Sequence, residues 1–268
     1  MKSPQILLTN DDGIPSPGLW AAASALSALG YVQVIAPRDQ FSGAGRSLPN
    51  TTDGIINPQT VVVNGNSWQV YSVGGTPAQV VLHAVLEILP ERPALVVSGI
   101  NYGENPGISI TASGTVGAAL EAASMHIPAL AISLETEPQQ HLSYSREVDF
   151  STAAHFTALF GRLLLEHSLP PDVDVLKVDI PSNATPQTAW TVTRLSRLRY
   201  WEALRPERAS WDTPTQMGYR LVSDAREDGS DTDVYALRVK RLVSVTPISL
   251  DMTSRIDLKD FEEELRAA

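Results

Sequence analysis

The chain has 268 residues, with 20 basic against 30 acidic side chains, a formal net charge of −10 at pH 7 and no cysteine. Without thiols, disulfides, thiolate zinc sites and iron–sulfur clusters are excluded. The acidic balance repels polyanions and disfavours a general binder of long nucleic acid. No apolar run approaches the roughly 20 residues that span a bilayer, and no signal-peptide core is recognisable. We therefore expect a cytoplasmic protein that has no membrane partner.

The first two thirds of the chain alternate strand-like and helix-like segments. Residues 6–9 are apolar and end in a β-branched residue, residues 18–29 follow a helical pattern up to Gly30, and residues 31–36 are strand-like again. This order predicts a parallel sheet. We further expect strands at 61–63, 68–73, 94–97, 128–134 and 173–180, helices at 77–89, 113–124 and 150–167, and irregular chain at 48–58.

An acidic turn, Asn-Asp-Asp-Gly at 10–13, follows the first expected strand. In open parallel sheets, ligands bind beyond the carboxyl ends of the strands, which is where Asp11 and Asp12 lie. Two adjacent carboxylates repel each other there, and a bound cation is the simplest counter-charge. The tetrapeptide is also good turn chemistry, and Asp often caps a helix. This motif alone therefore leaves both interpretations open.

Other strand ends carry further oxygen and amide groups. Ser42-Gly43 follows the second strand and offers a hydroxyl with an unhindered amide, although it also fits a polar surface loop. Asn101, in a glycine-rich loop, can bind a cation or a phosphate oxygen, or its own backbone. Ser113 is an expected N-cap at a helix start that offers free amides for an anion. Oxygen ligands of this kind suit Mg²⁺ or Mn²⁺.

Two further predictions concern side chains away from these loops. Thr76 is the expected N-cap of the helix at 77–89, with Pro77 in its first position. None of the five histidines lies in the strand-end loops described above, and we expect structural or exposed roles for them. They are His83, His126, His141, His155 and His167.

The pattern changes beyond residue 180. Short strand-like runs are expected at 191–193, 218–222 and 243–246, a helix start at Thr232-Asp233, and a charged amphipathic helix at 255–268. We expect a core at 1–180 and a β-rich extension with a terminal helix at 181–268. The hairpin at 59–73 and the segment 181–235 are both candidates for base recognition or subunit contact.

Several motifs then occur in a diagnostic order. They are 9–13, 36–37 with 42–43, 75–77, 98–101 with Gly103 and Asn105, 113–116, 232–233, and 243–247 with Asp251 and Thr253. In this order the chain resembles the SurE family, the survival-protein-E metal-dependent phosphatases. The resemblance implies an α/β fold with a Rossmann-like three-layer core, a mostly parallel sheet, and a C-terminal extension exchanged between subunits of a homodimer or homotetramer.

The resemblance also implies a reaction, the hydrolysis of nucleoside 5′-monophosphates, or of 3′-monophosphates, by a divalent-metal-dependent phosphomonoesterase. One Mg²⁺ or Mn²⁺ per subunit would be held by a set of four ligands. These are Asp11, Asp12, Ser42 and Asn101. The alternatives are a phosphatase for another small anion, such as short polyphosphate or a sugar phosphate, and a non-catalytic nucleotide or phosphate sensor.

Within this hypothesis Asp11, Asp12 and Asn105 are the catalytic residues. The phosphoryl oxygens would be held by Asn105 and the start of the helix at 113. The groups expected to hold them are Asn105, Ser113, Thr115 and the backbone amides of Gly43 and Gly114. A metal-bound water is the expected nucleophile. General-base action by one carboxylate, or direct attack by Asp11 or Asp12, is the alternative.

The chain departs from the family pattern at five positions in four segments. Gln79 and Ala112 stand where Asp and Tyr are usual, Pro106 stands for Leu, and residues 177–179 read Lys-Val-Asp in place of Asn-Val-Asn. None of these is a proposed metal ligand, so the departures bear on substrate preference and on details of the pocket.

Overall fold

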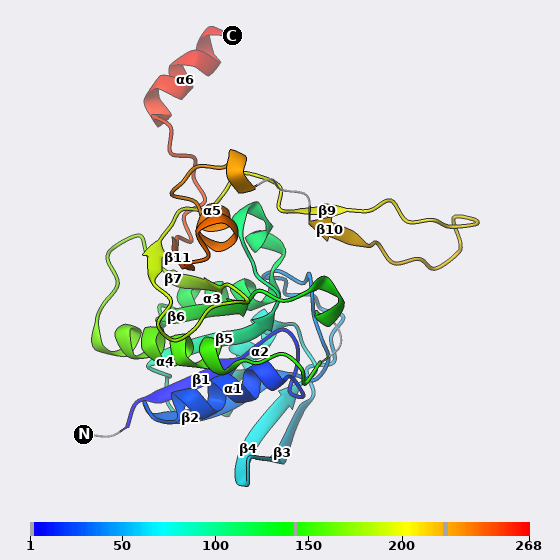
Figure 1. Ribbon diagram of the computed structural model, residues 1–268, viewed down its shortest axis with the longest axis vertical. Helices are drawn as coiled ribbons and strands as arrows, with labels where there is room; N and C mark the ends of the chain where they lie inside the picture. Colours follow the sequence, from blue (N-terminus) through cyan, green and yellow to red (C-terminus); the bar gives the residue numbers. More distant parts are fainter. Residues whose placement is uncertain (1–2, 142–143, 222–224) are drawn as a thin grey trace.

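The computed structural model describes residues 3–141, 144–221 and 225–268 (Figure 1). Val222, the last residue of the strand expected at 218–222, lies outside them. The strands are β1 (Gln5–Thr9), β2 (Tyr31–Pro37), β3 (Ile56–Val63), β4 (Asn66–Val73), β5 (Leu95–Tyr102), β6 (Ala129–Leu134), β7 (Val175–Ile180), β8 (Trp190–Val192), β9 (Trp201–Ala203), β10 (Tyr219–Leu221) and β11 (Val243–Ile248). The α-helices are α1 (Pro17–Leu26), α2 (Pro77–His83), α3 (Gly114–Ser124), α4 (Ser151–Glu166), α5 (Asp233–Tyr235) and α6 (Leu258–Ala267). Short 3₁₀ or π turns are η1 (Ala84–Ile88), η2 (Gly107–Ala112), η3 (Pro138–Gln140), η4 (Ala225–Glu227) and η5 (Ala236–Lys240).

Within the described chain, nine strands form one sheet in the order β3-β4-β2-β1-β5-β6-β7-β11-β8. The six strands from β4 to β7 are parallel, while β3 and β11 run antiparallel to β4 and β7. The chain winds outward from β1 in one direction and then from β5 in the other. This is the Rossmann order, with its topological switch point between β1 and β5. The predicted fold class is confirmed.

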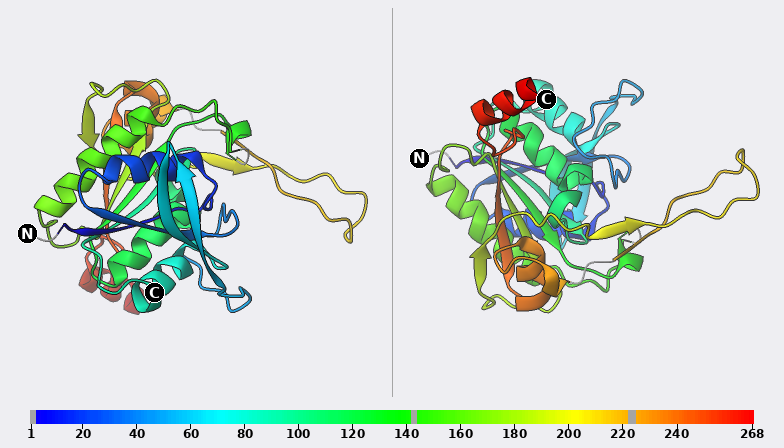
Figure 2. Two further views of the ribbon diagram at one scale, coloured as in Figure 1. Left: turned by 90° about the horizontal axis from the view of Figure 1, so that it is seen from below. Right: turned by 90° about the horizontal axis from the view of Figure 1, so that it is seen from above.

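Helices cover both faces of the sheet (Figure 2). Ile6 and Leu8 of β1 belong to the core that also contains α1 and α4, whereas Leu7 belongs to the core beneath α2 and α3. Successive strand residues point to opposite faces, so a continuous apolar strand is buried on both sides. The three layers fix the carboxyl ends of the parallel strands along one edge.

The hairpin is longer than the sequence pattern predicts. β3 begins at Ile56, which pairs with Val73, so the expectation of irregular chain as far as residue 58 is wrong at its last three positions. Asn64 and Gly65 both have positive φ, at 50° and 79°, and connect Val63 directly to its partner Asn66. A two-residue turn with this geometry matches the twist of the strands that it joins.

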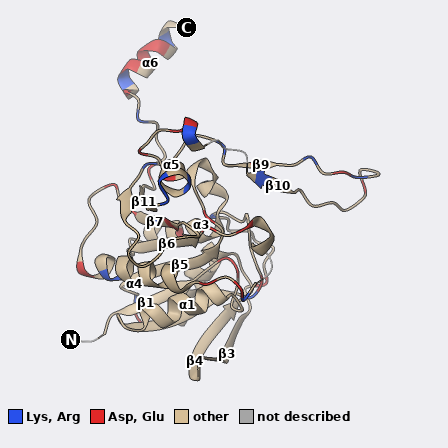
Figure 3. Cartoon of the chain, in the orientation of Figure 1, with Lys and Arg blue, Asp and Glu red and all other residues tan. Residues whose placement is uncertain are grey.

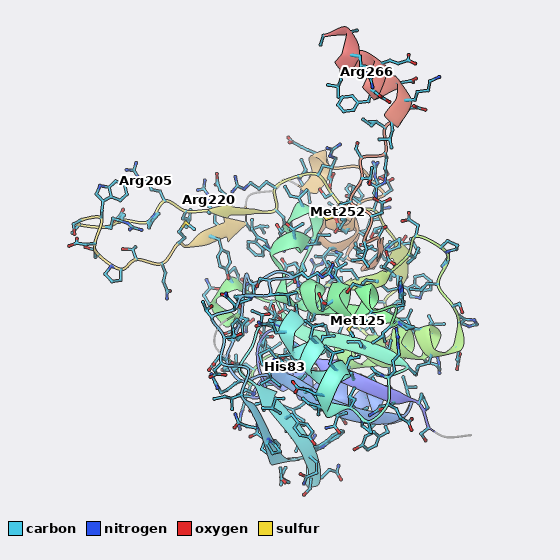
Figure 4. All side chains as sticks on the ribbon, turned by 180° about the vertical axis from the view of Figure 1, so that it is seen from behind. His83, Met125, Arg205, Arg220, Met252 and Arg266 are labelled. Carbon is cyan, nitrogen blue, oxygen red and sulfur yellow. The ribbon has the colours of Figure 1, made fainter. Side chains whose placement is uncertain are left out.

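The C-terminal part divides between the sheet and two projections. β8 and β11 complete the central sheet, while β9 and β10 form an antiparallel arm on which Figure 4 labels Arg205 and Arg220. α6 stands away from the body, is exposed throughout and carries both signs of charge (Figure 3). The boundary predicted at residue 180 stays a prediction. Of the helices that the structure describes, none has the length and apolarity to cross a membrane.

Candidate metal and phosphate site

The turn after β1 is closed by Asn10. Its side-chain oxygen accepts from the amide of Gly13 and its nitrogen donates to the carbonyl of Gly13, both at 3.1 Å. Gly13 has φ of 91°, a conformation that side chains rarely adopt. The clasp places Asp11 and Asp12 at the switch point, where they are 4% and 2% exposed. The structure therefore has the carboxylate pair at the end of the first strand, as predicted.

Asp11 rests on the N-terminus of α3. Its Oδ1 accepts a 2.6 Å hydrogen bond from the hydroxyl of Thr115, and the backbone amides of Gly114 and Thr115 also bond to it. Burial raises the pKa of Asp11, and these hydrogen bonds oppose the rise. A Cβ at Gly114 would lie 2.8 Å from Oδ2 of Asp11, so only glycine permits this approach. The helix start and the carboxylate are thus fixed against each other.

Asp12 is held from two other loops. Its Oδ1 accepts from Nε2 of Gln40 at 3.0 Å, and its Oδ2 accepts from the amide of Tyr102 at 3.3 Å. Burial and, next, the negative charge of Asp11 raise the pKa of Asp12 well above its usual range. Two adjacent buried carboxylates repel each other, and a bound cation would stabilise their charged forms.

Asn101 lies in β5, which extends to Tyr102, so the expectation that it lies in a loop is wrong; Ser42 lies in the loop after β2. Nδ2 of Asn101 donates to the carbonyl of Gly103 at 2.6 Å, so the amide oxygen is the atom that could serve as the predicted ligand. Ser42 is exposed, and its loop is joined to the pair by a 2.8 Å bond from the amide of Phe41 to the carbonyl of Asp11. The described residues contain no cluster of three or more His, Asp or Glu suited to a metal. The predicted set contains two carboxylates and two neutral oxygens, which fits a hard cation such as Mg²⁺ or Mn²⁺.

Some of the protein groups that are predicted to bind phosphate already form hydrogen bonds within the chain. Oγ of Ser113 accepts from the amide of Val116 at 3.1 Å, which confirms the N-cap and leaves the hydroxyl proton to donate elsewhere. The proton of Thr115 is directed at Asp11. Nδ2 of Asn105 donates to Oγ of Ser133 at 2.9 Å with one of its two protons. Gly43 is exposed, has φ of 80° and has open space beside it. The roles of these residues toward phosphate stay predictions.

A buried ionic network holds the backbone of Asn105. Lys177, Asp179 and Asp233 are all 0% exposed. The ammonium of Lys177 donates to Asp179, to Asp233 at 2.9 Å and to the carbonyl of Asn105 at 3.1 Å. Oδ1 of Asp179 accepts from the amide of Asn105 at 2.8 Å, and Oδ2 of Asp233 accepts from the amide of Gly107 at 2.8 Å. Two residues of the unusual Lys-Val-Asp sequence, Lys177 and Asp179, thus hold the backbone of Asn105, a residue predicted to bind phosphate.

The other departures have local roles. Gln79 completes a capping box, because its side chain accepts from the amide of Thr76 at 3.0 Å while its own amide donates to the Thr76 hydroxyl at 3.3 Å. The Thr76 cap is confirmed. Ala112 is exposed, and its carbonyl accepts from the amide of Gly45 at 2.9 Å. Pro106 is buried at the start of η2.

His141 also contacts the residues around the carboxylate pair, although no sequence pattern connected it with the acidic turn. Its carbonyl accepts from Nε2 of Gln40 at 2.9 Å, the same nitrogen that reaches Asp12. Its Nδ1 lies 2.9 Å from the hydroxyl of Tyr219, and its Nε2 is buried with no hydrogen-bond partner in the described chain. Burial lowers the pKa of His141. The available signal was its position in a polar segment after β6, at the same edge of the sheet as the acidic turn.

The fold and the carboxylate pair define a Rossmann-like α/β protein with a buried acidic site at its switch point. A family model described as Survival protein SurE matches residues 6–202. The 5′-nucleotidase SurE of Thermococcus kodakarensis is 44% identical over 264 residues, which cover 98% of this chain and 99% of the relative. That of Methanosarcina barkeri is 39% identical over 273 residues, with 99% of each chain covered. The SurE protein from Aquifex aeolicus has a crystal structure with a TM-score of 0.75 and 30% identity, covering 98% of this chain and 100% of that one. The chain belongs to the SurE family.

Proposed function

We propose that the protein is a divalent-metal-dependent phosphomonoesterase that hydrolyses nucleoside 5′-monophosphates to nucleoside and phosphate. The observation that carries the proposal is the buried Asp11–Asp12 pair at the switch point, in contact with the N-terminus of α3. The carboxylate pair is suited to a cation, and the helix N-terminus beside it is suited to a phosphate. Membership of the SurE family supports the class of phosphoric monoester hydrolases, because the curated relatives are named 5′-nucleotidases.

The cation would be a single Mg²⁺ or Mn²⁺ per subunit, held by Asp11, Asp12, Ser42 and Asn101. When bound, it supplies positive charge against the phosphate and lowers the pKa of a coordinated water. Thr115 and the α3 amides orient Asp11 through their hydrogen bonds. Gln40 and the amide of Tyr102 orient Asp12 in the same way.

The phosphoryl group would lie between the carboxylate pair and the start of α3. Ser113 has a hydroxyl proton to donate, Asn105 has a second amide proton, and Gly43 has an exposed backbone. Thr115, directed at Asp11, acts on phosphate only by turning its hydroxyl. Donors that are already in place when charge develops are each worth roughly 3 kcal/mol of barrier, or about a hundredfold in rate. Water is the proposed nucleophile, with attack by a carboxylate as the alternative.

The proposal includes a cytoplasmic homodimer or homotetramer. Leu258, Phe261 and Leu265 of α6 have exposed fractions of 62%, 43% and 63%, and their spacing places them along one side of the helix. A helix of mostly polar composition with one apolar side is stabilised when that side is covered. Its projection from the body, together with that of the β9–β10 arm, favours contacts with another subunit (Figures 1 and 2).

The test is phosphate release by the wild type from the four common nucleoside 5′-monophosphates, a 3′-monophosphate and tripolyphosphate. Each is assayed with Mg²⁺, with Mn²⁺ and with chelator. Release from 5′-monophosphates that stops in chelator is the expected result. Tripolyphosphate as the preferred substrate would favour a phosphatase for another anion. Nucleotide binding without release under any condition would favour a sensor.

A further inference from the structure

A cavity of about 560 Å³ lies at the carboxyl edge of the sheet. Its lining comes from the loops after β5, β6 and β7, from β9 and from η5. The lining includes Glu104, Glu135, Gln140, Trp201, Arg238 and Arg241. This volume is within the range of small-molecule sites. The strands β5, β6 and β7, whose following loops line the cavity, lie side by side in the sheet next to β1.

Two chain connections join this cavity to the proposed phosphate site. Glu104 precedes Asn105 in the loop after β5. Gln140 precedes His141, whose carbonyl accepts from the Gln40 nitrogen that also donates to Asp12. A ligand whose phosphate lies at the start of α3 therefore has the cavity beside it along the same edge.

Glu104 carries a hydrogen-bonding atom without a partner. Its carboxyl is 5% exposed, and Oε1 accepts from the hydroxyl of Tyr200 at 2.6 Å. Oε2 is buried and has no hydrogen-bond partner among the residues that the structure describes. A buried polar atom without a partner is destabilising, so Oε2 is available to a ligand that offers a matching polar edge.

Trp201 supplies a fixed aromatic wall. Its ring makes edge-on contacts with Tyr200, His141 and Tyr219, at centroid distances of 5.1, 5.8 and 5.4 Å. An indole held from several sides loses little freedom when a flat ligand stacks on it.

The two arginines of the cavity are outnumbered by the four carboxyl groups of its lining, those of Glu104, Glu135, Glu137 and Asp149. Arg238 and Arg241 both bond to the carboxylate of Glu135, which also accepts from the amide of Ser182 at 2.8 Å. The groups left for an occupant include the Trp201 ring, Oε2 of Glu104 and the buried hydroxyl oxygen of Thr136, which has no partner among the described residues either. This chemistry suits a neutral planar ring with a polar edge better than a second phosphate.

We propose that this cavity binds the base of the nucleoside monophosphate, with Trp201 stacking on the base and Glu104 hydrogen-bonding to its edge. The inference rests on the proposed function, because it takes the phosphate to lie at the start of α3. It makes Trp201 and Glu104 determinants of specificity for the base. Neither residue takes part in the chemistry at phosphorus.

The experiment compares kcat/KM for the four nucleoside 5′-monophosphates with kcat/KM for ribose 5-phosphate, which has no base. The variants are Trp201→Ala and Glu104→Gln, and the control is Trp211→Ala, whose indole is 93% exposed. The measured quantity is kcat/KM for a nucleotide divided by kcat/KM for ribose 5-phosphate. This ratio does not depend on the fraction of enzyme that is folded. Base–aromatic stacking is worth about tenfold in binding or more. A single hydrogen bond is worth about two- to tenfold.

Trp201→Ala is expected to lower the ratio of nucleotide to ribose 5-phosphate by about tenfold, and Glu104→Gln to change the order of preference among the four bases. Trp211→Ala should keep the wild-type ratio. Unchanged ratios and an unchanged base order in both variants, with a wild type that hydrolyses nucleotides, would overturn the base pocket and leave the proposed function standing. A wild type that hydrolyses neither kind of substrate would overturn the proposed function and the pocket with it.

Discussion

The hydroxyl of Thr115, at the start of α3, donates a 2.6 Å hydrogen bond to Oδ1 of Asp11, which lies 104 positions earlier in the chain. The bond joins the turn after β1 to the N-terminus of a helix, and Gly114 permits the close approach. The negative carboxylate is favourable there, because the free amides of the helix carry partial positive charge. The same contact fixes the distance between the proposed cation and phosphate sites.

Removing the Thr115 hydroxyl should weaken both folding and catalysis. Thr115→Val leaves a buried carboxylate oxygen without its donor, and we expect the free energy of unfolding to fall by about 1–3 kcal/mol. Thr115→Ser keeps the donor and should stay closer to the wild type. Chemical denaturation without added metal measures the difference. Equal stability of the Val and Ser variants would show that the bond contributes little.

Asn101→Ala should weaken metal binding. A cation that binds only the folded state at a hundred times its Kd raises the free energy of unfolding by about 2.7 kcal/mol. The variant should need a higher concentration of Mn²⁺ for the same increase in Tm. Asn57→Ala, at an exposed position of β3, is the matched control. If the Tm of Asn101→Ala and the Tm of the control rise equally at each Mn²⁺ concentration, Asn101 is not a ligand.

Lys177→Met should be strongly destabilising. The ammonium is 0% exposed and forms ion pairs with Asp179 and Asp233, which are equally buried. Breaking a buried ionic network by removing one partner costs about 3–5 kcal/mol, because the remaining charge is uncompensated. The control is Lys259→Met, whose side chain is 83% exposed and whose loss should cost less than about 1 kcal/mol. Urea denaturation measures the free energy of unfolding of both variants. Similar losses of this free energy in the two variants would contradict the structural importance of the network.

The stability of the metal-free protein should depend on Glu104 between pH 5 and pH 8. Burial raises the pKa of Glu104 from its ordinary value of 4.5 to about 7. For a raised pKa, the stabilising contribution is complete below 4.5 and is lost as the pH rises through 7. Relative to Glu104→Gln, the wild type should therefore lose up to about 3 kcal/mol between pH 5 and pH 8. A difference between the two proteins that does not change with pH would contradict a neutral Glu104 at low pH.

Local patterns were sufficient to predict the parallel sheet and the position of the carboxylate pair. Asp11 and Asp12 follow a short apolar strand, and this order alone places them at the carboxyl edge of a parallel sheet. The caps at Thr76 and Ser113 were likewise predictable, because their hydrogen bonds close within three residues. The same reasoning applied to residues 48–58 failed from Ile56 onward, where pairing with β4 decides the conformation.

Long-range partners were not predictable in this way. Tyr200 reaches Glu104 across 96 positions, and Lys177 reaches Asp233 across 56. Lys177 and Asp179 are two residues apart on one strand and so share a face, but no pattern in the sequence indicated that this face is fully buried. His141 joins the site through its carbonyl group, which has no sequence signature. Such contacts depend on which loops the folded sheet brings together.

The most direct test of the central claim is the rate of phosphate release from a nucleoside 5′-monophosphate by wild type and Asp11→Asn, with Mn²⁺ and with chelator. Near- and far-ultraviolet circular dichroism establishes that both proteins are folded. We expect metal-dependent release by the wild type and a loss of about a hundredfold or more in the variant, because the substitution removes a cation ligand and its charge. A folded Asp11→Asn protein that releases phosphate at the wild-type rate with Mn²⁺ would contradict the assignment of the carboxylate pair as the metal site.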